Sequence, residues 1–137
     1  MLAAVAAEDV EKVRNVYEHW ARGDWSAGAD LFADDLYATT FDADGDEIEC
    51  RSRAELAEWL RSFLKQWDEI RQEAQEIVEC GDRVYAVARQ YGTGRASGVE
   101  LVMAVYNVWV FRNGRVVEFH TTRHEGVARA KAGLNAR

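Results

Sequence analysis

Hydrophobic positions have mainly a helical period in the first half of the chain and mainly strand alternation in the second half. Residues 7–22 and 52–66 each carry one apolar stripe at spacings of three and four, which predicts two amphipathic helices. The stripes are Val10, Val13, Val16, Tyr17 and Trp20 in the first, and Leu56, Trp59, Leu60, Phe63 and Leu64 in the second. Gly23 ends the first helix, and Ser52 with Glu55 forms a capping box for the second.

Between and after these helices, short apolar runs predict strands over residues 36–41, 70–80, 84–91, 99–111 and 116–124. A short helix is expected after Asp24, an acidic loop over residues 42–50, and a helical tail over 127–134. Asn113-Gly114 is the strongest turn signal, because a type I′ turn needs positive φ at both central residues. Helices first and antiparallel strands last predict one α+β domain over residues 1–137. Its curved antiparallel sheet would wrap around the N-terminal helices as a cone with an apolar cavity.

The hairpin around Asn113-Gly114 has one mostly apolar face with polar groups set into it. Strand alternation places Val105, Asn107, Trp109 and Phe111 on that face. The same argument adds Val117, Phe119, Thr121 and Arg123 from the second strand. Such a surface suits either a ligand pocket or a core.

Composition excludes several classes of protein. The 137 residues are 48% hydrophobic and carry a net charge of −7, which argues against nucleic acid and anionic membranes as partners. No apolar stretch approaches the ~20 residues that span a bilayer, and the N-terminus lacks the pattern of a signal peptide. Two cysteines, Cys50 and Cys80, show no disulfide framework, so a reducing cytoplasmic setting is expected.

Several segments together resemble the SnoaL-like branch of the nuclear transport factor 2-like superfamily. They are VRNVYEHWARGD (13–24), DLFADDL (30–36), SGVE (97–100), NVWVFRNGRVV (107–117) and the ending Ala132-Gly133-Leu134. The resemblance implies a cone-shaped apolar cavity and a homodimer formed through the outer face of the sheet. The superfamily includes isomerases, cyclases, epoxide hydrolases, dehydratases and non-catalytic binders, so function must be argued from the site.

The resemblance also implies positions for catalytic groups. Ketosteroid-isomerase relatives have a carboxylate base where this chain has Thr40 and a tyrosine donor where it has Val16. Their oxyanion-hole aspartate corresponds to Asn107, whose amide can also donate a hydrogen bond. The isomerase base is therefore missing.

Two other relatives lead to the same conclusion. In limonene-epoxide hydrolases an arginine corresponds to Arg89, but Tyr91 and Thr121 stand where the two carboxylates should be. SnoaL-like cyclases use a polar group near the end of the last strand, where His120 and His124 lie. Strand parity places His120 on the outer face, opposite in direction to Phe119.

We therefore assign no catalytic residue and expect a ligand pocket, the alternative for its aromatic members being core packing. The pocket candidates are Tyr17, Trp20, Trp59, Phe63, Arg89, Tyr91, Asn107, Trp109, Phe119, Thr121 and Arg123. Asn107 either donates to a ligand or is satisfied by Tyr17, a backbone group or water. Arg89 and Arg123 either face an anionic ligand or pair with carboxylates at the mouth of the cone.

No metal or cofactor is expected. His120 and His124 lie at the junction of a strand with a helix and have no third ligand. Asp42, Asp44 and Asp46 have calcium-loop spacing, but the loop lacks the glycine and glutamate positions of an EF-hand. A solvated loop is expected there.

Two functions remain open at this stage. The first is a cone-shaped protein that binds a small apolar molecule, either as a cofactor-independent enzyme of isomerase, cyclase or hydrolase type or without catalysis. The second is a non-catalytic binding or dimerisation module whose working surface is the outer sheet face, with Tyr106, Val108 and Val110.

Overall fold

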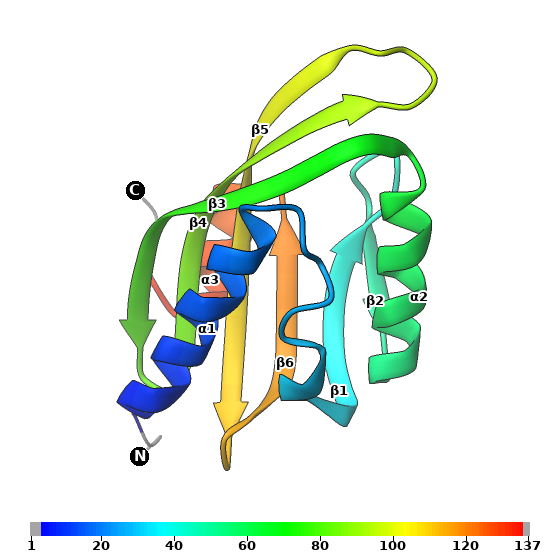
Figure 1. Ribbon diagram of the computed structural model, residues 1–137. Coiled ribbons are helices and arrows are strands. Elements are labelled where there is room, and N and C mark those ends of the chain that lie inside the picture. The colour runs from blue at the N-terminus through cyan, green and yellow to red at the C-terminus, as the bar shows by residue number, and fades with distance from the viewer. Residues whose placement is uncertain (1–3, 136–137) are drawn as a thin grey trace.

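The strands of the computed structural model, which describes residues 4–135, form one curved, unclosed six-stranded sheet with helices on both faces (Figure 1). The elements are α1 (Ala7–Trp20), the 3₁₀ turn η1 (Ala29–Leu31), β1 (Phe32–Phe41), β2 (Glu47–Cys50), α2 (Arg53–Leu64), β3 (Trp67–Cys80), β4 (Arg83–Gly94), β5 (Glu100–Arg112), β6 (Arg115–Thr122) and α3 (Glu125–Ala132). The strand order is β2-β1-β6-β5-β4-β3, and β1 pairs with β6 in parallel while the other pairs are antiparallel. The predicted α+β class is confirmed.

Two helices cover the concave face of this sheet. In Figure 1, α1 lies in front of the strands on the β3 side, and α2 lies at the other edge of the sheet, beside β1 and β2. The apolar stripe predicted for α1 is buried as expected. None of the helices within residues 4–135 is both long and apolar enough to span a bilayer. The ends of the expected domain, residues 1–3 and 136–137, lie outside the described residues.

Helix α2 packs much less tightly than α1. Its start is capped, because the Ser52 hydroxyl accepts a hydrogen bond from the Glu55 backbone N–H at 3.1 Å. The Glu55 side chain reaches back one residue further than in a standard capping box, to the N–H of Arg51 at 3.0 Å. Leu56 is the one fully buried residue of the helix. The rest of its apolar stripe is half-buried.

The hairpin between β5 and β6 turns where the sequence predicts, with φ of 53° at Asn113 and 78° at Gly114. A register shift follows the turn, because Phe111 pairs with Val116 while Trp109 pairs with Phe119. Val117 is the extra residue of this bulge. Val116, not the expected Val117, therefore takes the fully buried place opposite Phe111.

The third helix covers part of the outer face of the sheet. Helix α3 lies behind the strands in Figure 1 and packs on β4, β5 and β6. It covers Tyr85, Val108 and Val110, which are at most 2% exposed. The expectation that Val108 and Val110 form an accessible surface is therefore wrong.

Two further expectations fail. Residues 42–50 are not all loop, because Glu47–Cys50 forms β2 along the edge of β1. In β4 the inner face carries Val84, Ala86, Ala88 and Gln90, which pair in the sheet with β5 residues including Trp109 and Asn107. The larger side chains of β4, including Arg89 and Tyr91, consequently point to the outer face.

Candidate functional site

A cavity of about 110 Å³ lies between the sheet and the layer formed by α1, η1 and α2. Its apolar lining consists of Trp20, Trp25, Ala27, Ala29, Phe32, Phe41, Leu56, Ala57, Trp59, Leu60, Phe63 and Phe119. Its polar lining consists of Arg53, Gln72, Gln90, Asn107 and Thr121. The volume exceeds the space one water needs but is smaller than the ~300–1,000 Å³ typical of sites for drug-sized ligands.

Stacked aromatic rings form the wall of the cavity under α2. Trp59 and Phe63, one helical turn apart, stack with centroids 5.2 Å apart and planes 16° apart. Phe41 of β1 meets both rings edge-on, at 5.6 and 5.9 Å. The Trp59 indole N–H donates to the Phe41 carbonyl at 3.0 Å, so the polar atom of this wall is already satisfied.

A second aromatic group closes the opposite side. Trp20 of α1 stacks on Trp25 with centroids 5.0 Å apart. Their indole N–H groups donate to the backbone carbonyls of Ala27 (3.3 Å) and Ile70 (2.9 Å). Both walls therefore present carbon surface to the cavity, since their polar atoms are directed into the backbone.

Three of the five polar lining residues are side-chain amides, and hydrogen bonds link them in a row. Asn107 Nδ2 donates to Gln72 Oε1 at 2.8 Å, and Gln72 Nε2 donates to Gln90 Oε1 at 3.0 Å. All three residues are at most 4% exposed. The strand register explains the meeting of the glutamines, because Gln72 of β3 pairs directly with Gln90 of β4.

Tyr17 of α1 holds this network from the helix side. Its hydroxyl accepts from Asn107 Nδ2 at 2.8 Å and from Trp109 Nε1 at 3.0 Å. Burial raises the pKa of Tyr17 far above its usual value, and the two hydrogen bonds offset only part of that rise. Tyr17 is therefore a neutral hydrogen-bonding group near pH 7.

The structure brings together six of the eleven predicted pocket residues in the cavity lining: Trp20, Trp59, Phe63, Asn107, Phe119 and Thr121. Tyr17 and Trp109 are buried but do not line the cavity; Tyr17 is hydrogen-bonded to the lining residue Asn107, and Trp109 is hydrogen-bonded to Tyr17. Of the partners considered for Asn107, Tyr17 is the one that is found. It reaches Asn107 although the resemblance assigned the tyrosine position to Val16.

Three predicted pocket residues lie elsewhere. Arg89 is exposed on the outer face, because the inner face of β4 is the one with the small residues. Tyr91 is half-buried on the same outer face, with the Arg71 guanidinium 4.1 Å from its ring centroid. Arg123 is exposed just after the end of β6, where its guanidinium lies 5.2 Å from the Phe41 ring centroid.

Sequence reasoning missed Gln72 and Gln90. In β4 either the odd-numbered or the even-numbered residues could form the inner face. The larger side chains at the odd positions suggested the wrong one. The available signal was the even-numbered series Val84, Ala86, Ala88, which is small enough to pack under a helix. Had that face been taken as the inner one, Gln90 would have been placed in the cavity.

A separate buried polar group lies on the outer face of the sheet. His120 points to the outer face, as its parity predicts, and it is 3% exposed there. Its Nδ1 lies 2.8 Å from Thr39 Oγ1 and its Nε2 lies 3.1 Å from Glu118 Oε1. Burial lowers the pKa of His120, and the hydrogen bond to Glu118 partly opposes this. This group does not line the cavity.

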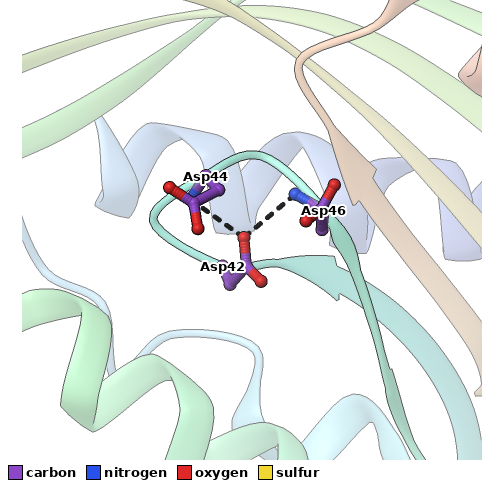
Figure 2. Close-up of side chains that lie close together, drawn as sticks. All are labelled: Asp42, Asp44 and Asp46. Atoms are coloured by element: carbon purple, nitrogen blue, oxygen red, sulfur yellow. Dashed lines mark hydrogen bonds between the residues drawn. The ribbon is translucent and has the colours of Figure 1, made fainter.

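In the acidic loop before β2, an aspartate side chain is hydrogen-bonded to the backbone of the same loop (Figure 2). Asp42 Oδ1 accepts hydrogen bonds from the backbone N–H groups of Asp44 at 2.9 Å and Asp46 at 3.0 Å. All three aspartates are exposed, with carboxylate oxygens within 4.8 Å of one another. These features are those of a solvated turn in which an aspartate caps the loop.

A larger hollow of about 720 Å³ lies between the end of α1, the start of β3 and the projecting ends of β4 and β5. Tyr91 lines it, together with charged residues that include Arg22, Asp68 and Glu100. The smaller cavity is the better candidate site, because there aromatic walls surround a few convergent, buried polar groups.

Comparison with known proteins agrees with this architecture. A family model described as the SnoaL-like domain matches residues 13–119. Among curated protein sequences, none matches the chain.

Solved structures resemble more than nine tenths of the chain. An NTF2-like protein of unknown function from Burkholderia pseudomallei matches with a TM-score of 0.74 and 22% identity, over 91% of this chain and 97% of that one. IdmH from Streptomyces antibioticus, a candidate polyketide cyclase, matches with a TM-score of 0.68 and 22% identity, over 93% and 99%. A protein of ketosteroid isomerase-like fold from Catenulispora acidiphila, in complex with trimethylamine, gives 0.69 and 16%, over 91% and 94%. These likenesses concern the fold.

Proposed function

We propose that this chain, which belongs to the SnoaL-like domain family, binds a small apolar molecule in the cavity between its helices and its sheet. The observation that carries the proposal is an aromatic wall facing three buried side-chain amides. Apolar walls supply affinity, and a few fixed polar groups orient the ligand. The fold similarity to a candidate polyketide cyclase supports a ligand of polyketide type.

The present volume of the cavity suggests how a ligand enters. Trp59, Leu60 and Phe63 of α2 line it and are only half-buried, although they are large apolar side chains. An occupant that moved α2 outward would bury this apolar surface on the ligand, at the cost of the contacts that Trp59 and Phe63 make with Phe41. We therefore expect the cavity to widen on binding through a displacement of α2.

The lining also bears on catalysis. Arg53 is the one ionisable side chain among the described residues that line the cavity, and it pairs with Asp34 at 2.6 Å. The positions where relatives hold a carboxylate base carry Thr40 and Thr121. Binding is therefore the primary activity that we propose. Cyclase or isomerase chemistry here would rely on hydrogen bonds from the amides to polarise the substrate.

The test uses a cavity-filling variant. Ala57 lines the cavity from α2, whereas Ala54 is exposed on the same helix. We expect naphthalene and indene, which have no hydrogen-bonding group, to bind the wild type and Ala54→Phe in calorimetric titrations, and Ala57→Phe to lose that binding. Unchanged affinity in Ala57→Phe, or no binding to the wild type at millimolar concentration, would count against the proposal.

A second candidate function is dimerisation through the outer face of the sheet, beyond the area that α3 covers. Val102 is 62% exposed and pairs with Tyr91 of that face. Sedimentation of wild type and Val102→Lys tests this function. Val127→Lys, which replaces a residue 42% exposed on α3, is the matched control. A wild type that sediments as a monomer at micromolar concentration would exclude it.

The cellular setting that we propose is the cytoplasm. Cys50 and Cys80 are both free thiols, Cys50 buried and Cys80 half-buried. Unpaired cysteines are usual in reducing compartments.

A further inference from the structure

The three amides of the cavity form a chain in which every hydrogen bond runs in the same direction. Asn107 donates to Gln72, Gln72 donates to Gln90, and Gln90 Nε2 donates to Met103 Sδ at 3.8 Å. Gln72 and Gln90 therefore each turn the side-chain nitrogen toward Met103 and the oxygen toward Asn107. Because each amide has an oxygen at one side and a nitrogen at the other, none can turn around alone without placing like atoms against each other.

Met103 sets this direction. A thioether sulfur can accept a hydrogen bond but has no hydrogen to donate. If Gln90 turned around, its oxygen would face the sulfur lone pairs, and Gln72 and Asn107 would have to turn as well. The acceptor at the Met103 end thus determines whether the oxygen or the nitrogen of Asn107 lacks a hydrogen-bond partner at the other end.

The atom left over is Asn107 Oδ1. The Nδ2 group of Asn107 is held by two acceptors, Tyr17 and Gln72. Among residues 4–135, no donor reaches Oδ1, although Asn107 is 1% exposed. A buried carbonyl oxygen without a donor is unfavourable, and Asn107 lines the cavity. An occupant with a hydroxyl or N–H group could supply the missing hydrogen bond.

We propose that the cavity selects apolar molecules that carry a hydrogen-bond donor, such as phenols, enols or N–H heterocycles, over ketones, ethers and quinones. Met103 is the specificity-determining residue, acting through Gln90 and Gln72 without contact to the ligand. This inference rests on the proposed function, since it requires the ligand to occupy this cavity.

Three bicyclic probes of similar shape test the selectivity. Indole has one N–H donor, 1-indanone has one carbonyl acceptor, and indene has neither. In calorimetric titrations of the wild type, we expect indole to bind about tenfold more tightly than indene, as one net hydrogen bond provides. 1-Indanone should bind no more tightly than indene. Equal affinity for indole and indene would overturn this inference alone, whereas failure of all three to bind would also overturn the proposed function.

The direction of the chain is tested by Met103→Lys. Met103 is half-buried, and an ammonium group in its place can donate to Gln90 but cannot accept. The amides should then turn around and present Asn107 Nδ2 to the cavity, so 1-indanone should gain about tenfold over indene and indole should lose its advantage. Ala104→Lys adds the same charge at the neighbouring exposed position and should keep the wild-type ranking. A wild-type ranking in folded Met103→Lys would refute the role of Met103.

Discussion

Replacement of Tyr17 by phenylalanine isolates the contribution of one buried hydroxyl. The ring keeps its packing against Trp20 and Trp109, whose centroids lie 5.3 and 5.9 Å away. The lost oxygen is the acceptor for Trp109 Nε1 and Asn107 Nδ2, and both residues are at most 1% exposed. The substitution therefore leaves two donors short of a partner without creating a large cavity.

The two losses differ in size. Within the described residues, Trp109 Nε1 has no other acceptor, so it bears the desolvation cost of an unsatisfied buried donor, about 1–3 kcal/mol. Asn107 Nδ2 keeps its bond to Gln72 and loses one of two, which costs about 0.5–1.5 kcal/mol. We expect Tyr17→Phe to lower the free energy of unfolding by about 1.5–4.5 kcal/mol, a large part of the ~5–15 kcal/mol of a typical domain.

Urea unfolding followed by far-UV circular dichroism measures this loss, with an unchanged m-value as evidence that the same surface is exposed. The matched control is Tyr37→Phe, which removes a hydroxyl that donates to Glu49 at 2.7 Å in an exposed pair. Water replaces that bond, so a loss below about 1 kcal/mol is expected. If Tyr17→Phe came within about 0.5 kcal/mol of the control, the network would not stabilise the fold as argued.

Further predictions concern the outer face and two glycines. Because burial lowers the pKa of His120 below its ordinary value of 6.5, the unfolded chain binds the proton more readily, and the free energy of unfolding should fall as pH drops from 6.5 through the folded-state pKa. Denaturant titrations at several pH values should show this slope weakened in His120→Gln and kept in His124→Gln, whose side chain is exposed. Gly92→Ala should destabilise by about 1–3 kcal/mol, since its Cβ would lie 2.5 Å from the Trp67 ring. Gly126→Ala should stabilise by up to about 1 kcal/mol, because its Cβ in α3 would have no close neighbour within 4 Å among residues 4–135. Thermal unfolding of the two alanine variants checks both signs.

Local signals explain why the order of elements could be predicted from the sequence. The Asn113-Gly114 turn and the Ser52 cap each depend on residues adjacent in the chain, and both are found. Helix α1 was predictable because a single face of it contacts the sheet, which leaves a clear stripe. Strand β2 was missed because its four residues include two glutamates and only Ile48 and Cys50 are apolar.

The faces of the strands were harder to predict, because both sides of the sheet are covered. In β4, Tyr85 points outward and is 0% exposed under α3, while Ala86 points inward and is also 0% exposed. When both parities are buried, hydrophobicity no longer distinguishes them, and side-chain size misleads. The errors at Arg89 and Tyr91 follow from this one choice of parity. The bulge at Val117 is likewise set by the pairing of β5 with β6 and has no signature in either strand alone.

The chemistry of the site is less local still. Four different elements supply Tyr17, Gln72, Gln90 and Asn107. The pairing of the strands and the position of α1 on the sheet bring these side chains together. Because each amide in the chain constrains the next, the hydrogen-bonding character of Asn107 depends on Met103, which does not line the cavity. The lining residues alone are compatible with Asn107 as either a donor or an acceptor toward a ligand. The direction of the hydrogen bonds from Asn107 to Met103 decides whether Asn107 offers an acceptor or a donor. For that reason Met103→Lys should reverse the preference between donor and acceptor ligands without altering the lining of the cavity.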